Sequence, residues 1–316
     1  MKQMVMDLHC DTLTRDQFPG GEMAPGRPFF DQPGYQLCLS RLPAGAGYVQ
    51  CFAVFIPDRL RGAEGAAYFD RCAARYHRQM AGDSRAADCR TMAQAEAALA
   101  EGKLAGFLTV EGGSALGGKL ERVEELYRAG VRMLTLTWNG KNELASGHDT
   151  GEGFTAFGRE AVAALEERGI LVDVSHLNDR GFEELLPLVK KPFVASHSNA
   201  RSVCGHRRNL PDAFIREMAE RRCLIGLNYC RHFLSDEGRG DREDLWRHVA
   251  RFLELGAGDC LALGSDFDGA DIHPDLLGGE KSLALGDFLV KKGLTPAQAE
   301  RILYGNARDF FARAFP

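Results

Sequence analysis

Side chains that bind metals recur in this chain directly after short apolar runs. The motifs are His9-Cys-Asp11, Glu111-Gly-Gly, Asp173-Val-Ser-His176, Ser196-His197-Ser198 and Ser265-Asp266-Phe-Asp268. Side chains two residues apart in an extended segment point to the same side, so His9 and Asp11 can reach one cation together. Each motif alone has a structural alternative, since the pair could be buried or capping and Glu111 could cap the next helix. Together they predict a metal site.

The ligand types and their number indicate which metal this is and how many ions bind. His176 and His197 end consecutive apolar runs, so we expect them to be neighbours that share one ion. Imidazoles mixed with carboxylates suit Zn²⁺, Mn²⁺ or Fe²⁺ better than Ca²⁺ or Mg²⁺, and we predict zinc. Five ligands exceed what one catalytic tetrahedral zinc takes with an open position, and Glu111 can bridge two ions. We therefore predict a binuclear site with metals about 3.5 to 4 Å apart.

The motif Ser265-Asp266-Phe-Asp268 offers a proton carrier. Asp266 ends the last apolar run, where its carboxylate can accept a proton from a water between the metals and return it to a leaving amine. Asp268 is the alternative carrier, and one of the two aspartates could instead brace the loop. We predict that Asp266 is the catalytic residue.

These motifs require an architecture that gathers strand ends in one place. Apolar runs alternate with longer amphipathic segments, as in βα units around a parallel sheet. Eight strands are predicted, over Met4–Leu8, Tyr48–Phe55, Leu104–Val110, Val131–Thr137, Ile170–Val174, Phe193–Ser196, Cys223–Asn228 and Leu261–Gly264. Eight parallel strands favour a (β/α)₈ TIM-like barrel, in which strand ends meet at the C-terminal rim and carry the active site.

Helical periodicity is clearest between these runs. Helices are predicted over Ala66–Met80, Met92–Ala100, Leu120–Ala129, Phe157–Arg168, Asp179–Val189, Pro211–Arg221, Glu243–Leu255 and Ala297–Ala312. Gly130, Gly169 and Gly256 follow helical patterns and suit left-handed C-caps. We predict one hydrolase domain over residues 1–316, with a loop insertion around residues 17–42 that serves as a lid or pocket wall.

Composition limits the class of protein and its partners. Of 316 residues, 45% are hydrophobic and 26% charged, which suits a globular fold, and the net charge of −5 gives no reason to expect nucleic acid or membrane as a partner. We expect a small-molecule substrate. Nine cysteines without a C-x-x-C pair indicate reduced thiols. We find no signal peptide or transmembrane stretch and expect a cytoplasmic protein.

Together with SHSNARSVCGHRRNLPD, residues 196–212, these motifs resemble the membrane (renal) dipeptidase family of zinc metallopeptidases over nearly the whole chain. The resemblance implies that His9, Asp11 and Glu111 hold one zinc and that Glu111, His176 and His197 hold the other. It assigns Arg208 to the free carboxylate of a dipeptide, a role that suits a guanidinium. It further implies hydrolysis of dipeptides, L-D dipeptides among them, and a homodimer.

The chain departs from this family at Trp138, where better-known members carry a histidine that helps to bind substrate. An indole has one N–H donor and no basic nitrogen, so it can donate a hydrogen bond but cannot act as an imidazolium. Asn139, Asn142 or His148 could supply the missing donor, although His148 also fits an exposed loop. We predict substrate contacts from Trp138 and Asn139. Two alternatives stay open: an amidohydrolase-type enzyme acting on a lactam, lactone or N-acyl amino acid, and a metal-binding homologue with weak activity.

Overall fold

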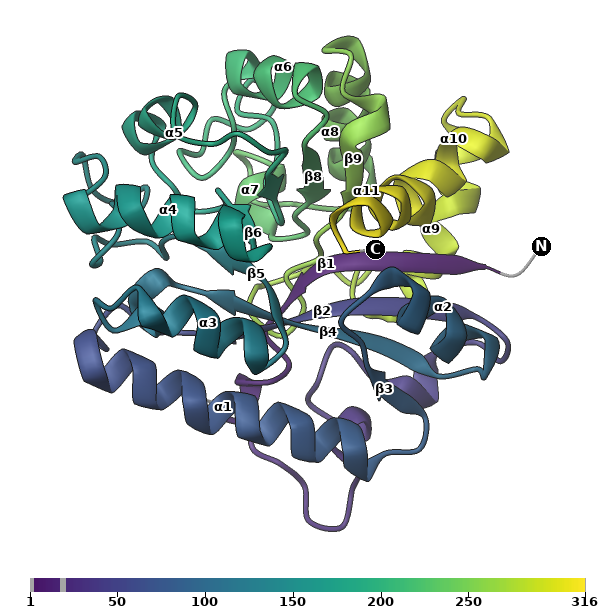
Figure 1. Cartoon of the computed structure of the whole chain (residues 1–316). Helices are drawn as coiled ribbons and strands as arrows, with labels where there is room; N and C mark the ends of the chain where they lie inside the picture. Colours follow the sequence, from purple (N-terminus) through teal and green to yellow (C-terminus); the bar gives the residue numbers. More distant parts are fainter. Residues whose placement is uncertain (1–2, 18–20, 316) are drawn as a thin grey trace.

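Eight parallel strands close into a barrel in the computed structural model, which describes residues 3–17 and 21–315 (Figure 1). Around the barrel the order is β1-β2-β4-β5-β6-β7-β8-β9, and it closes because β1 also pairs with β9. The strands are β1 (Met4–Cys10), β2 (Gly47–Phe55), β4 (Leu104–Glu111), β5 (Val131–Thr135), β6 (Leu171–Asp173), β7 (Val194–Ala195), β8 (Leu224–Leu227) and β9 (Leu261–Leu263). The predicted (β/α)₈ fold is confirmed, and every predicted strand is present.

One further strand, β3 (Ala86–Asp88), was not predicted. It pairs with the start of β4, where Ala86 lies opposite Leu104, on the edge that β5 occupies from Leu108 onward. Three residues that include an aspartate carry little strand signal, so this strand depends on its partner.

Most predicted helices occur within a few residues of their expected ends. They are α1 (Gly62–Gly82), α2 (Met92–Ala100), α3 (Glu121–Arg128), α4 (Ala156–Arg168), α5 (Asp179–Leu185), α6 (Asp212–Glu220) and α8 (Arg242–Glu254), with α7 (Arg231–Leu234) and α9 (Gly279–Lys291) in addition. Gly130, Gly169 and Gly256 have φ values of 97°, 86° and 78°, which confirms the predicted left-handed C-caps.

The predicted helix Ala297–Ala312 is present as one continuous helical segment that contains a π-helical turn. It consists of α10 (Pro296–Glu300), the π-helical turn over Arg301–Gly305 and α11 (Asn306–Ala314). Asn306 donates from Nδ2 to the carbonyl oxygens of Gly258 and Leu261, at the start of β9. The C-terminal helix therefore covers the end of the barrel opposite the rim where the strands end (Figure 1).

The long segment after β1 packs onto that rim. Residues 18–20 of the predicted 17–42 loop lie outside the described residues. Tyr35 and Leu37 are buried, and Gln36 exchanges hydrogen bonds with Asp268: its backbone N–H donates to Oδ1 at 2.6 Å, and its Oε1 accepts from the Asp268 N–H at 2.7 Å. The segment is thus fixed to the loop after β9.

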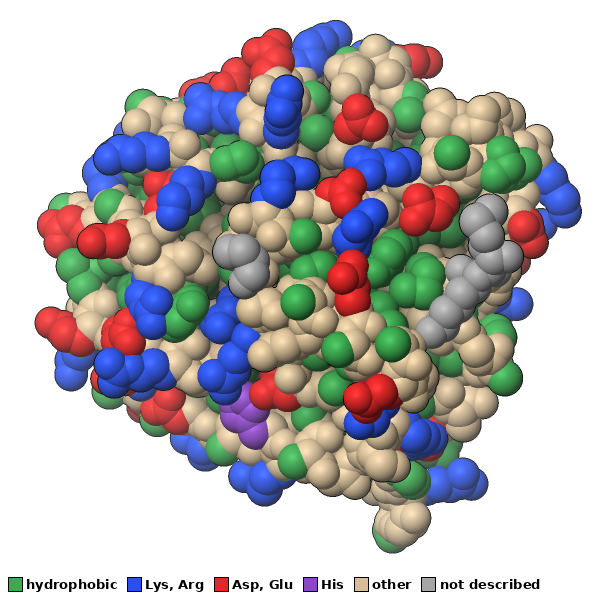
Figure 2. All heavy atoms as spheres, turned by 45° about the vertical axis from the view of Figure 1, so that its right-hand side comes forward, with side chains coloured by type: hydrophobic (Ala, Val, Ile, Leu, Met, Phe, Trp, Pro, Cys, Tyr) green, Lys and Arg blue, Asp and Glu red, His purple; other side chains and the backbone are tan. Residues whose placement is uncertain are grey.

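The surface carries mixed charge. On the face shown in Figure 2, basic and acidic side chains are interspersed among apolar ones. Among the helices of residues 3–17 and 21–315, none combines the length and apolarity that crossing a bilayer requires. The nine cysteines are all unpaired and buried.

Candidate metal centre

The five predicted metal ligands meet at the C-terminal rim of the barrel. His9 and Asp11 come from the end of β1, Glu111 is the last residue of β4, and His176 and His197 follow β6 and β7. Each is at most 8% exposed. These residues lie close together because the carboxyl ends of parallel barrel strands meet at the same rim.

Glu111 lies between two groups of the predicted ligands, His9 with Asp11 and His176 with His197. The groups are close together: His9 also clusters with Glu111 and His197, and with Asp11 and Asp266, in sets whose ligand atoms lie within 4.8 Å of one another. The Oε2 atom of Glu111 lies 3.7 Å from the Nε2 of His9, which is itself 3.4 Å from the Oδ2 of Asp11. The Oε1 atom lies 2.8 Å from the Nε2 of His176 and 3.4 Å from the Nε2 of His197. One carboxylate thus directs a separate oxygen to each group, as a bridging ligand does.

Hydrogen bonds set which ring nitrogens of His176 and His197 carry the proton. The Nδ1 of His176 lies 2.8 Å from the amide oxygen Oδ1 of Asn139, which can only accept, so this Nδ1 carries the hydrogen. The Nδ1 of His197 lies 2.7 Å from the Oγ of Ser196, whose own hydrogen goes to the Asp173 carboxylate at 2.6 Å. Both Nε2 atoms therefore present lone pairs, and they face each other at 3.0 Å beside Glu111.

This donor set fits a cation. Burial lowers the pKa of both His176 and His197 well below the usual range, so both rings are neutral ligands. Within the described residues, the Nε2 of His9 and the Oδ1 of Asp11 are buried without a hydrogen-bond partner. Converging lone pairs and carboxylates in a buried site need positive charge among them, and metal ions supply it.

The pKa shifts of Glu111 and His9 also indicate that this site requires positive charge. Burial raises the pKa of Glu111 well above its ordinary value. Burial also opposes a charge on His9, but Glu111 and Asp11 outweigh it and raise the pKa of His9 to about 10.

The backbone is strained at this rim. His176, Asp266 and Asp268 have φ values of 69°, 64° and 68°, and Arg222 is the only other non-glycine residue with positive φ in the described chain. Such conformations cost of order 1 kcal/mol or more and persist where surrounding structure fixes them, often at functional sites.

The structure places the two candidate proton carriers differently. The Oδ1 of Asp266 lies 3.9 Å from the Nε2 of His9, and its Oδ2 accepts a hydrogen bond of 3.0 Å from Asn228. Burial raises the pKa of Asp266 to about 6. Asp268 instead accepts from Thr12 Oγ1 at 2.5 Å and from the Gln36 backbone at 2.6 Å, so it braces the segment after β1.

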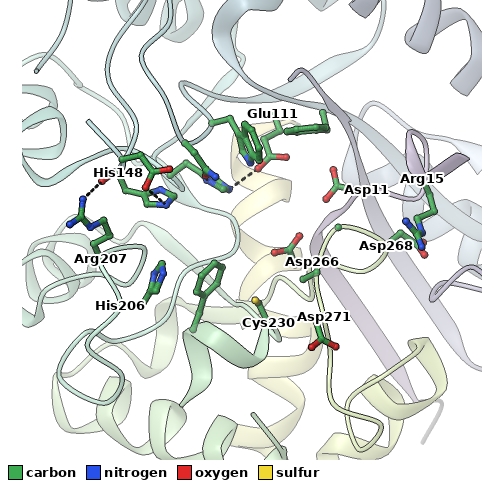
Figure 3. A pocket seen from close by; sticks show the side chains of 18 residues that line it. Asp11, Arg15, Glu111, His148, His206, Arg207, Cys230, Asp266, Asp268 and Asp271 are labelled. Carbon is green, nitrogen blue, oxygen red and sulfur yellow. Dashed lines mark hydrogen bonds and ion pairs between the residues drawn. The ribbon is translucent and has the colours of Figure 1, made fainter. Parts of the chain in front are cut away.

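A cavity of about 830 Å³ opens above the ligands. Its lining includes Asp11, Glu111, Trp138, Asn139, His148, His176, His206, Arg207, Asp266, Asp268 and Asp271. In Figure 3, His148, His206 and Arg207 lie on one side of the cavity, and Asp11, Asp266, Asp268 and Asp271 lie on the other, with Arg15 beside Asp268. A fifth lining aspartate, Asp149, lies 3.6 Å from the Nε2 of His148. The cavity therefore has one mainly acidic side and one side on which histidines and Arg207 lie with Asp149.

Arg208 lies behind the cavity wall. It is 4% exposed, donates from Nη1 to Ser198 Oγ at 3.0 Å and from Nη2 to the His197 carbonyl at 2.8 Å, and its Nε has no partner among the described groups. Its neighbour Arg207 is exposed and lines the cavity. Arg208 thus braces His197 from behind, and its Nε–H is a buried donor without a partner among the described groups.

The residues predicted to replace the family's histidine as a hydrogen-bond donor to substrate lie in different surroundings. Trp138 and Asn139 both line the cavity, and Asn139 also orients His176. Asn142 is committed to its own loop, donating to the Leu136 carbonyl and accepting from the N–H of Leu144. His148 is 9% exposed and lines the cavity, so its interpretation as an exposed loop residue is wrong.

Sequence reasoning missed one residue of this site and two contacts. Phe55 lines the cavity, Asn228 holds Asp266, and Ser196 connects His197 to Asp173. Phe55 and Asn228 lie where β2 and β8 end, so their positions in the chain were the available signal. The partners that Asn228 and Ser196 contact are set by the barrel.

Comparisons with known proteins identify the family of this chain. A protein-family model described as membrane dipeptidase (peptidase family M19) matches residues 1–312 of this chain. An uncharacterized protein encoded in the pqqA 5' region of Klebsiella pneumoniae is 31% identical over 231 residues, which cover 69% of this chain and 85% of that protein.

Two crystal structures are similar to the structure of this chain along their whole length. A metallopeptidase from Rhodobacter sphaeroides, bound to a phosphinate mimic of the dipeptide L-Ala-D-Ala, superposes with a TM-score of 0.89 at 26% identity and 100% coverage of both chains. The dipeptidase AC, a metallopeptidase of family M19, has a TM-score of 0.89 at 27% identity, with 100% of this chain and 99% of that chain covered.

Proposed function

Since this chain belongs to the membrane dipeptidase family, peptidase family M19, we propose that it is a zinc-dependent dipeptidase with a binuclear centre. The observation that carries the proposal is the position of Glu111 at the base of the cavity, where its Oε2 faces His9 and its Oε1 faces His176 and His197.

His9, Asp11 and Glu111 would hold one zinc ion, and Glu111, His176 and His197 would hold the other. When bound, the metals supply Lewis acidity, which polarises a scissile carbonyl and acidifies water at neutral pH. Asn139 and Ser196 hold His176 and His197 in the neutral tautomer that a metal needs.

The cavity suits a substrate with a positive and a negative end. A dipeptide carries an ammonium group, which would lie toward Asp266 and Asp271, and a carboxylate, which would lie toward His148 in the cavity lining, with Arg208 behind the wall. Arg208 would supply its unpartnered Nε–H and its charge to that carboxylate. The Rhodobacter sphaeroides relative binds a mimic of L-Ala-D-Ala, which supports including L-D dipeptides among the substrates.

Asp266 would move the proton. Its Oδ1 faces His9 and the cavity, while Asn228 holds Oδ2, so one oxygen is fixed and the other is free to accept a proton from water and return it to the leaving amine. Asp268 has both oxygens engaged by Thr12 and Gln36 and would serve as a brace.

The proposal is tested by measuring metal content and hydrolysis of L-Xaa-L-Ala and L-Xaa-D-Ala dipeptides, with and without added Zn²⁺. We expect about two metal ions per chain and release of free amino acids that depends on the metal. Bound metal without cleavage of any dipeptide would instead favour a lactam, lactone or N-acyl amino acid as substrate.

A pair of matched variants tests the proton carrier. Asp266→Asn keeps the size of the side chain but removes its basicity, so we expect kcat to fall by about 10² to 10⁴ while metal content stays unchanged. Asp268→Asn makes the same change on the neighbouring aspartate and should lower kcat by less than about tenfold. Equal losses in both variants would contradict the assignment of Asp266.

A further inference from the structure

Two aromatic side chains form one wall of the cavity. Phe55 ends β2, Trp138 follows β5, and both line the cavity. Their rings meet edge to face, with centroids 4.8 Å apart and an angle of 75° between the planes. We name this pair the aromatic wall. Edge-to-face contact is a favourable aromatic arrangement, so the two rings support each other.

The aromatic wall is held in place by the loops that carry it. The N–H of Ile56, next to Phe55, donates to the Glu111 carbonyl at 2.9 Å. The N–H of Gly140 donates to Asp58 Oδ2 at 2.8 Å, which ties the loop after β5 to the loop after β2. The surface offered to a ligand is therefore formed before the ligand arrives, which lowers the entropic cost of binding.

The order of strands fixes where the aromatic wall stands around the rim. Going round the barrel, β2, β4 and β5 lie between β1, which carries Asp11, and β6, which is followed by His176. The aromatic wall thus stands between Asp11 and His176 on this part of the rim. A dipeptide that spans the two sides of the cavity passes a side chain along these rings.

The chemistry of this wall selects for apolar groups. The side chains of Trp138 and Phe55, which line the cavity, are an indole and a phenyl ring and carry no charge. A cavity of about 830 Å³ lies in the upper part of the ~300–1,000 Å³ range of small-molecule sites, so it has room for side chains larger than methyl. Covering the rings with an alkyl side chain removes apolar surface of both partners from water.

We propose that Trp138 and Phe55 form a specificity wall that favours dipeptides with a large apolar side chain over dipeptides with small ones. This inference rests on the proposed dipeptidase function. It makes Trp138 a residue that determines specificity, at a position where the family resemblance places an imidazole.

The test compares kcat/KM for L-Leu-L-Ala, L-Ala-L-Leu and L-Ala-L-Ala, which place an isobutyl group at either position or at neither. At least one leucine dipeptide should exceed L-Ala-L-Ala by about tenfold or more in the unmodified enzyme. Trp138→Ala should reduce this ratio to within about threefold of one, whereas Trp138→Phe, which keeps an apolar ring, should retain most of it.

The chain provides a matched control. Trp246, its only other tryptophan, lies on α8 outside the cavity lining, so Trp246→Ala should leave the ratio unchanged. In Trp246→Phe protein, Trp138 is the sole tryptophan, and its fluorescence should change when a phosphinate mimic of the preferred leucine dipeptide binds.

Each result distinguishes the two proposals. The unmodified enzyme could cleave dipeptides without a preference for leucine, or Trp138→Ala could keep that preference. Either result would contradict the proposed specificity wall and leave the proposed dipeptidase function intact. If the metal-loaded enzyme cleaves no dipeptide, both proposals are overturned.

Discussion

The Ser196 hydroxyl links the ring of His197 to the buried carboxylate of Asp173. It accepts the Nδ1 hydrogen of His197 at 2.7 Å and donates to Asp173 at 2.6 Å. Ser196→Ala removes this link and leaves a buried Nδ1–H without a partner. The ring can then rotate or change tautomer, and either change misdirects the Nε2 lone pair. We predict weaker metal binding at the group formed by Glu111, His176 and His197.

The size of the effect follows from the lost hydrogen bond. A buried donor left unsatisfied costs about 1–3 kcal/mol. Because about 1.4 kcal/mol corresponds to a factor of ten in an equilibrium constant, the dissociation constant of this metal should rise by about 5- to 150-fold. Residues that orient a metal-binding histidine typically change metal affinity by about 10- to 100-fold, which agrees with this range.

Competition with a chromophoric chelator measures the affinity directly, without relying on turnover. Ser198→Ala is the matched control, because the Ser198 hydroxyl contacts Ser175 and the Nη1 of Arg208 instead of an imidazole. Its metal affinity should stay within about threefold of the unmodified protein. Equal metal affinities in Ser196→Ala, Ser198→Ala and the unmodified protein would refute the argument.

Three further predictions concern the substrate anchor, the rim glycine and a buried histidine. Arg208→Ala should raise KM by about tenfold or more, because it removes a charge-assisted contact with the substrate carboxylate, while Arg207→Ala should change KM less. Steady-state kinetics of the two variants test this prediction. A larger rise in KM for Arg207→Ala would assign the substrate carboxylate to Arg207. Gly269→Ala should lower metal content measured by elemental analysis, because its methyl group would lie 2.0 Å from Asp11 Oδ2. Gly151→Ala is the control and should keep full metal content, because the space around Gly151 is open. Full metal content in both variants would contradict the packing argument. Burial lowers the pKa of His248 to about 4, so the unfolded chain binds a proton that the folded chain excludes, and stability should fall by up to about 3 kcal/mol as the pH drops from about 6.5 to 4. Denaturant titrations of metal-free protein should show that His248→Gln loses this part of the pH dependence; an unchanged slope would rule out the contribution of His248.

The elements that the sequence failed to predict depend on contacts between distant segments. The helix α9 contains Gly286, which weakens its helical signal, yet a Cβ atom there would lie 2.9 Å from Leu303, so the glycine permits close packing. The strand β3 exists through its pairing with β4. In both cases a tertiary contact outweighs weak local preference.

The sequence by itself determined the barrel and the identity of the residues at its rim. Alternating apolar runs and amphipathic segments specify βα units, and parallel strands bring their ends together, so His9, Glu111 and His176 could be grouped without coordinates.

Only the tertiary structure decided how these residues divide their roles. It directed the two oxygens of Glu111 to different histidines, placed Asp266 beside His9 and Asp268 against Gln36, and paired Trp138 with Phe55. Residue types and spacing specify which groups reach a rim. Side-chain direction, burial and hydrogen-bond partners depend on neighbouring strands that are distant in sequence, and these neighbours are fixed when the barrel closes.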